Sequence, residues 1–162
     1  FAGDEFDEVE FIHLICSKAG CGLLLDINNV EVTAHNIGFD ARTYLKRINA
    51  SLVEEIHIAG HAVEWFDDGT ALKIDDHGSD TSECCWELLA EFVRDHGPFS
   101  ILVERDSNIP PYAELVREMT RAKSLLDAED SNAAHTLAKN GFTDTCEPPY
   151  PGVARWALSA AA

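Results

Sequence analysis

The sequence predicts an α/β fold built from parallel βαβ units, and three observations lead to this prediction. Three short apolar segments, at residues 23–27, 55–59 and 100–104, have the length and composition of buried strands. Segments with the three- and four-residue apolar spacing of helices lie before, between and after them. A chain of 162 residues is long enough for one domain with a single core. Strands that alternate with helices form parallel sheets, since the helix returns the chain for a strand in the same direction.

The first predicted elements are a helix and a strand. Residues 4–18 place apolar side chains at helical spacing among acidic ones, which predicts an amphipathic helix that ends at Gly20. The apolar run Leu23–Ile27 then stops at Asn28-Asn29. Such a short continuous run is typical of a strand that is buried on both faces.

The middle of the chain is predicted to add a helix, a second strand and a loop. Asp40 can cap a helix that runs to about residue 48. Residues 55–59 are predicted to form the second buried strand. We expect residues 63–78 to form an irregular segment, with a turn at 67–69.

The last predicted elements are two helices with a strand between them. One of residues 79–81 is expected to cap a strong amphipathic helix that ends at residues 96–98. Residues 100–104 are predicted to be the third strand. The prolines at 110–111 are expected to start a helix whose apolar pattern weakens beyond residue 127.

Three strands are too few to close a barrel, and an open sheet would leave its edges and one face uncovered. The pattern therefore fits either a small open α/β layer or the C-terminal part of a TIM-type (β/α)8 barrel, which commonly needs about 250 residues. The sequence starts at Phe1 in an acidic, helix-like stretch, and we expect a complete protein to have strands before it. We assign residues 1–127 to the barrel part and residues 128–162 to a C-terminal helix or tail of unassigned role.

Composition excludes several classes of partner. Twelve basic residues against 29 acidic ones give a formal net charge of -17. Such a surface repels phosphate backbones and anionic lipids, so we expect neither nucleic acid nor membrane as a partner. No apolar run reaches the ~20 residues that span a bilayer, and no secretory signal is seen, so we expect a cytoplasmic protein. The five cysteines form no CxxC pair, which argues against a disulfide framework or a thiolate zinc site.

Each predicted strand is followed by polar side chains that bind metals or move protons. The carboxyl ends of parallel strands open on one face, so these side chains are expected to meet there. Strand alternation points His57 away from Ile56 and Ile58, toward a barrel interior. Imidazole, carboxylate and amide ligands without thiolate suit manganese, iron or zinc, and more than four candidates suggest a multinuclear site. The candidates are Asp26 with Asn29, His57 with His61, Glu104 with Asp106, and Asp75, Asp76 and His77.

Each candidate also has an ordinary structural interpretation. Asp26 taken alone would be assigned as a helix cap or turn residue. Glu104 could form a structural ion pair with Arg105 or Arg42. The remaining candidates could be turn or loop residues: Asn28, Asn29, His61, Asp75, Asp76 and His77. Four such groups at one rim favour the metal site over four separate coincidences.

Four segments of the sequence also resemble the motifs of a known family. They are Gly20-Cys21-Gly22-Leu23-Leu24-Leu25-Asp26-Ile27-Asn28-Asn29-Val30, Glu55-Ile56-His57-Ile58-Ala59-Gly60-His61, Ile74-Asp75-Asp76-His77-Gly78, and Val103-Glu104-Arg105-Asp106 with Asn108-Ile109-Pro110. In order and spacing they are similar to the successive motifs of the multinuclear non-haem iron-dependent oxidative enzymes. That family includes the iron enzyme of methanobactin biosynthesis. The resemblance covers about residues 5–125.

The resemblance implies a TIM barrel that holds two or three iron ions at its carboxyl face and uses dioxygen as cosubstrate. It implies an oxidase or oxygenase that modifies cysteine or other residues of a ribosomally made precursor peptide, with a partner protein that presents the peptide. The resemblance implies seven iron ligands in this chain: Asp26, Asn29, His57, His61, Asp75, His77 and Glu104. Two further histidines and a bridging glutamate belong to the amino-terminal part of the family's barrel, so we expect this chain to be incomplete. Asp76 stands where the family commonly has threonine, and its side chain is expected to point away from the metals.

Two other classes of function fit the same residues. Another divalent-metal barrel enzyme, a sugar isomerase or a phosphodiester hydrolase with manganese or zinc, uses similar ligands on the same scaffold. A truncated module could instead bind metal or peptide without turnover. Metal content distinguishes the first class, and comparison with a longer gene product distinguishes the second.

Overall fold

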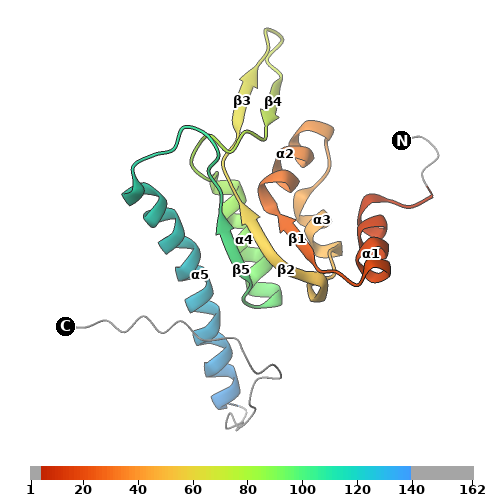
Figure 1. The fold of residues 1–162 in the computed structure, drawn as a ribbon, viewed down its shortest axis with the longest axis vertical. Coiled ribbons are helices and arrows are strands. Elements are labelled where there is room, and N and C mark those ends of the chain that lie inside the picture. The colour runs from red at the N-terminus through yellow and green to blue at the C-terminus, as the bar shows by residue number, and fades with distance from the viewer. Residues whose placement is uncertain (1–4, 140–162) are drawn as a thin grey trace.

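The computed structural model describes residues 5–139, with side-chain surroundings up to residue 128. Its centre is a parallel sheet in the order β1-β2-β5, with β1 at Leu23–Asp26, β2 at Val53–Ile58 and β5 at Ser100–Val103. A separate antiparallel hairpin, β3 (Ala62–Trp65) and β4 (Ala71–Ile74), projects beyond the sheet (Figure 1). The predicted α/β class and the parallel strand direction are therefore confirmed.

The first helix, α1, spans Glu8–Ala19 and begins four residues later than the sequence pattern suggested. Asp7 caps it: its carboxylate accepts the backbone N–H of Glu10, whose side chain accepts the N–H of Asp7 in return. The helix ends at Gly20, where φ is 65°. Glycine adopts this left-handed conformation without a steric penalty, so the predicted end of the helix is confirmed.

The segment after β1 differs from the prediction. The strand ends at Asp26, and helix α2 (Ile27–Ile37) begins at the next residue. The Asp26 carboxylate caps this helix by accepting the N–H of Asn29 at 2.9 Å. The alternative interpretation of Asn28 and Asn29 as turn residues is therefore wrong. Burial of the strand on both faces is also wrong, because Leu24 is 50% exposed.

The next elements follow the prediction closely. Helix α3 (Ala41–Arg47) is capped by Asp40, whose carboxylate accepts the N–H of Thr43 at 2.6 Å. A short 3-10 helix, η1 (Ala50–Leu52), leads into β2, which begins two residues before the predicted start. In the register of the sheet, Asp26 pairs with His57, and His57 pairs with Leu102 of β5.

The segment predicted to be irregular contains the β3–β4 hairpin. Its turn lies at the predicted position, and Gly69 there has a φ of 81°. The outer edge of β4 is occupied by a side chain of α2: Asn36 donates to the carbonyl of Lys73 at 2.8 Å and accepts its N–H at 2.9 Å. Because an amide side chain takes the place of a neighbouring strand, this hairpin is fixed to the body of the domain at its base.

Two helices complete the described structure. Helix α4 (Glu83–His96) is capped by Ser82, one residue after the predicted range, because the Ser82 hydroxyl accepts the N–H of Cys85. Helix α5 (Tyr112–Lys139) continues through residue 127, so the boundary that we assigned lies inside a helix. The rest of the predicted tail, residues 140–162, lies outside the described residues, as does Cys146. The other four cysteines are free thiols.

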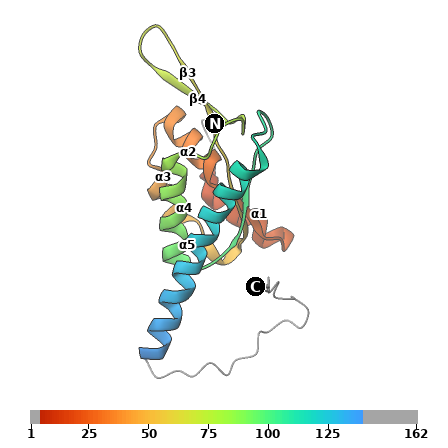
Figure 2. The ribbon, with the colours of Figure 1, turned by 90° about the vertical axis from the view of Figure 1, so that its left-hand side faces the viewer.

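The hydrophobic core lies on one face of the sheet. Ile56 and Ile58 of β2 are fully buried there, against Leu88 and Leu89 of α4. Helix α4 lies behind the sheet in Figure 1, and Figure 2 shows α4 and α5 side by side on that face. None of the helices within residues 5–139 combines the length and the apolar character needed to cross a membrane.

Candidate metal centre

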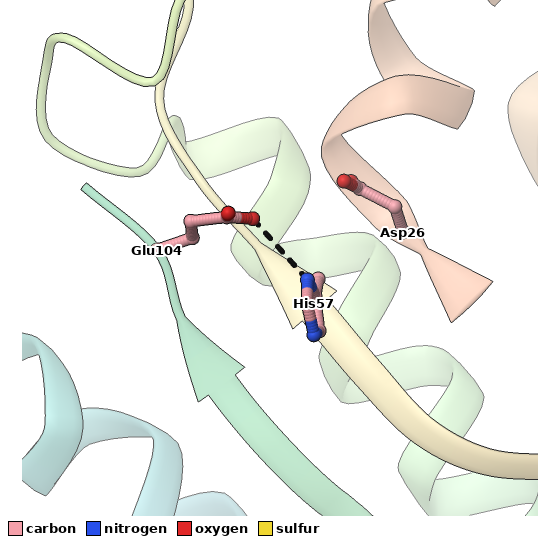
Figure 3. Close-up of side chains that lie close together, drawn as sticks. All are labelled: Asp26, His57 and Glu104. Carbon is pink, nitrogen blue, oxygen red and sulfur yellow. Dashed lines mark hydrogen bonds and ion pairs between the residues drawn. The ribbon is translucent and has the colours of Figure 1, made fainter. Parts of the chain in front are cut away.

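The carboxyl ends of the three parallel strands bring together the first group of candidate ligands. Asp26 ends β1, His57 lies in β2 and Glu104 directly follows β5. Figure 3 shows the three side chains facing a common space from neighbouring strands. One ligand atom from each lies within 4.8 Å of the others. The geometry expected from the parallel topology is therefore present for these three residues.

Glu104 contacts two histidines that come from different segments. Its Oε2 atom lies 3.2 Å from Nδ1 of His57 and 3.5 Å from Nδ1 of His77. The backbone N–H of Glu104 donates to the carbonyl of Ile58 at 2.9 Å, which extends the pairing of β5 with β2 by one residue and fixes this side chain at the rim. Glu104 thus belongs to both groups of close metal-binding side chains found in the described residues.

The second group is centred on His77. Its Nε2 atom lies 3.0 Å from Oδ1 of Asp75, and its Nδ1 atom lies 3.1 Å from Oδ2 of Asp106. The φ of His77 is 47°, a conformation that is costly for a residue with a Cβ and that concentrates at functional sites. Burial alone would lower the pKa of His77, but Asp75, Glu104 and the Asp106 hydrogen bond outweigh burial and raise this pKa.

A third set of contacts connects Asn28, His61 and Asp75. Asn28 is fully buried at the start of α2, and its amide nitrogen donates to Asp75 at 2.5 Å and to the carbonyl of Gly60 at 3.4 Å. Its Oδ1 atom lies 2.9 Å from Nδ1 of His61. A Cβ at Gly60 would lie 2.2 Å from the backbone oxygen of Ser79, so glycine allows the loop to approach this closely.

Asn29, the amide predicted from the sequence, lies elsewhere on the same rim. It is exposed, and its amide nitrogen donates to Oδ2 of Asp26 at 2.9 Å. The structure therefore brings Asn29 to the first group and its neighbour Asn28 to His61 and Asp75. Asp76 accepts the backbone N–H of Gly78 at 3.2 Å and belongs to neither donor group found in the described residues.

Of the structural roles suggested above for Asp26 and Glu104, the first is confirmed and the second is wrong. Asp26 is indeed a helix cap, and it also contributes to the first donor group. Glu104 does not pair with either arginine. Arg105 instead pairs with Asp80 at 2.7 Å and Glu118 at 3.1 Å, and Arg42 pairs with two carboxylates of α4. In the described part of the chain, the ion pairs of Asp75, Glu104 and Asp106 all involve histidine rather than lysine or arginine.

The donor set is suited to a divalent cation. Carboxylates gathered at one rim repel one another, and a bound cation would relieve this repulsion. Imidazole nitrogen and carboxylate oxygen are preferred ligands of iron, manganese and zinc. The sequence did not indicate a ligand role for Asn28. It also did not single out Glu31, a residue of α2 that is 4% exposed. The one sequence feature that connects these two residues is their three-residue spacing, which places them on the same face of a helix.

Comparison with known proteins gives a consistent result. A family model described as "RiPP precursor modification enzyme MbnB/TglH/ChrH" matches residues 1–127. A UPF0276 protein of Bordetella bronchiseptica is 44% identical over 126 residues, which cover 78% of this chain and 44% of that protein. UPF0276 proteins of Caulobacter vibrioides and Pseudomonas aeruginosa are 43% and 42% identical, over 76% and 75% of this chain and 44% and 41% of their own lengths. The chain spans less than half the length of these curated relatives.

Proposed function

Because the chain belongs to the RiPP precursor modification enzyme family MbnB/TglH/ChrH, we propose that it is the C-terminal part of an iron-dependent oxidative enzyme. The substrate class is a ribosomally made precursor peptide, modified at cysteine or another residue with dioxygen as cosubstrate. A partner protein that presents the peptide is part of this proposal. Residues 1–127 would form part of a TIM barrel, with further strands beside β1 and β5.

The observation that carries the proposal is the position of Glu104 between two donor groups. Glu104 is shared by two donor groups, one with Asp26 and His57 and one with His77 and Asp106. A carboxylate has two oxygens and can therefore bridge two cations. The arrangement supports a multinuclear centre rather than a single tetrahedral zinc.

The proposed ligands are those predicted from the sequence: Asp26, Asn29, His57, His61, Asp75, His77 and Glu104. The geometry adds Asp106 and Asn28 as candidates. Bound iron would supply the redox chemistry and the Lewis acidity. The chain's own contribution is to hold these side chains at one rim.

Metal analysis of protein purified without oxygen tests this proposal. We expect iron to bind the 162-residue chain, and the Glu104→Gln variant to retain half of that iron or less, because a neutral amide is a weaker ligand for a cation than a carboxylate. Glu114→Gln is the matched control, since Glu114 lies on the surface beside Arg117. Full occupancy by zinc or manganese without iron would contradict the proposal and favour an isomerase or hydrolase.

A second measurement addresses the peptide. A cysteine-containing precursor peptide is incubated with the iron-loaded protein and air, and its mass is measured. A mass change that requires iron and dioxygen supports oxidative modification. Iron binding without any change, also for a gene product of the relatives' length, would contradict it and favour a module without turnover.

A further inference from the structure

A buried carboxylate lies directly behind His61, outside both close donor groups. Glu31 of α2 is 4% exposed, and its Oε1 atom lies 3.7 Å from Nε2 of His61. The His61 side chain is 5% exposed. A buried carboxylate is costly unless charges and hydrogen bonds compensate it, so its position requires an explanation.

Two side chains from other elements hold Glu31 in place. Lys73 of β4 donates its ammonium group to Oε1 at 2.5 Å, and Ser82, the cap of α4, donates its hydroxyl to Oε2 at 2.5 Å. The Ser82 oxygen in turn accepts the N–H of Cys85. The backbone of Lys73 is fixed by two hydrogen bonds with Asn36. The carboxylate is therefore compensated and oriented independently of His61.

The hydrogen bonds around Asn28 determine what faces the other nitrogen of the His61 ring. The Asn28 amide nitrogen has two acceptors, Asp75 and the carbonyl of Gly60, so its oxygen is the atom directed at Nδ1 of His61. An unprotonated Nδ1 and an amide oxygen at 2.9 Å are both acceptors, so either a proton or a cation must lie beside them.

A histidine that binds a metal must have a neutral ring, and for a neutral ring the two cases differ in which form of Nε2 faces Glu31. With a proton on Nδ1 of neutral His61, the lone pair of Nε2 faces the carboxylate, which is unfavourable. With a cation beside Nδ1, the proton is on Nε2 and points toward Glu31, which is favourable. Histidines that bind metals commonly donate their other ring N–H to a carboxylate in this way.

We propose that Glu31, held by Lys73 and Ser82, is a positioning residue that fixes the His61 ring with its Nε2–H toward Glu31 and its Nδ1 free for a metal ion. This inference rests on the proposed function, since it assumes that His61 is a ligand. It adds Glu31 as a residue that would not contact the metal but would set the tautomer of His61, the proposed ligand.

Zinc binding followed by nitrogen-15 NMR of the histidine rings tests the inference. Zn²⁺ is diamagnetic, and the His61 signals report on this site alone. In the wild-type chain we expect Nδ1 of His61 to shift on zinc binding, with a proton on Nε2. In Glu31→Gln we expect zinc affinity at His61 to fall about 10- to 100-fold and the Nε2 proton to exchange faster with water. Glu87→Gln, which alters a surface pair with Arg42, should leave both quantities unchanged.

Two further variants separate the outcomes. Glu31→Gln with Lys73→Met removes both charges together, so it tests positioning without an unpaired buried ammonium, and it should lose zinc affinity in the same way. An affinity within twofold of wild type, with an unchanged Nε2 proton, would overturn the inference. If His61→Ala lowers zinc affinity while Glu31→Gln does not, the ligand role survives and only the positioning role fails. If the wild-type His61 signals do not respond to zinc, the ligand role proposed for His61 fails as well.

Discussion

The two faces of the central sheet differ in what covers them, although the same strands supply both. On the face toward α4, Ile56 and Ile58 have no exposed surface. On the opposite face, Leu24 is 50% exposed and Leu102 is 43% exposed. His57 of β2 lies between β1, which carries Leu24, and β5, which carries Leu102. Strand alternation thus gives β2 two separate roles. Its even-numbered isoleucines stabilise the fold, and His57 between them belongs to the candidate site.

The largest expected effect is on the free energy of unfolding, when one leucine on each face of the sheet is replaced by alanine. Leu89→Ala on the covered face should lower the free energy of unfolding by about 2–5 kcal/mol, because Leu89 is fully buried and leaves a cavity. Leu102→Ala on the open face should cost about 1 kcal/mol or less, since much of that side chain already contacts solvent. Urea unfolding of the 162-residue chain measures both.

Equal losses for the two leucine variants would break this comparison. A large loss for Leu102→Ala would mean that its face is covered in solution, for example by a second copy of the chain. Sedimentation at two protein concentrations would then show an oligomer.

A smaller effect is expected from the two neighbouring asparagines at the rim. Asn28→Ala removes two donated hydrogen bonds from a fully buried position, and should cost about 1–3 kcal/mol in the free energy of unfolding. Asn29→Ala is exposed and should change this free energy by about 0.5 kcal/mol or less. Thermal and urea unfolding measure the difference, and iron binding by the two variants shows which amide matters to the site.

The reverse order, with Asn29→Ala more destabilising than Asn28→Ala, would contradict the hydrogen bonds described at this rim. A loss of iron in Asn29→Ala alone would support the amide predicted from the sequence. A loss in Asn28→Ala alone would favour the buried one.

The smallest effect concerns a cap remote from the open face. Hydrogen bonds from the side chain and backbone of Thr43 lower the pKa of Asp40 below its ordinary value. A carboxyl whose pKa is lower in the folded state stabilises the fold above its unfolded pKa, and this stabilisation is lost as pH falls through the folded pKa. Asp40→Asn keeps a capping side chain but cannot titrate. Its melting temperature should therefore fall less steeply than that of wild type as pH falls through the pKa of Asp40.

Melting temperatures measured between neutral pH and strong acid check this expectation. A difference between the two proteins that stays constant across the whole range would show that the charge of Asp40 is not what the cap contributes. Asp68, whose pKa is lowered in the same way by hydrogen bonds with Thr70 at the tip of the hairpin, provides a second test, since Asp68→Asn should change the acid dependence in the same direction.

The fold was predictable where a local signal marks the end of each element. Gly20 and Gly97 end helices, and Asp40 begins one. Helix α2 was missed because no glycine or proline separates it from β1, so the apolar run passes from strand to helix without a break. The hairpin was missed because each of its strands has only four residues and neither strand contains a buried one.

The candidate site, like the fold, was predictable only in part. Asp26, His57 and Glu104 follow from the parallel topology alone, because strand ends meet at one rim. The relation of Asn28 to Asn29 does not follow, because consecutive residues of a helix point about 100° apart and the direction is fixed only once α2 is known to begin at Ile27. Glu31 depends on the same helix, which places it on the face of Asn28.

The hairpin leaves the body of the domain directly after His61 and returns directly before Asp75. Ala62 pairs with Ile74 at the base of the hairpin. The distance between the two ends of the hairpin therefore does not depend on the length of its strands. Insertions or deletions near Gly69 should therefore be absorbed at the tip, where a backbone glycine has open space around it. This makes the tip a convenient attachment point for a fluorescent label, one that reports on an approaching molecule without perturbing the residues beneath it.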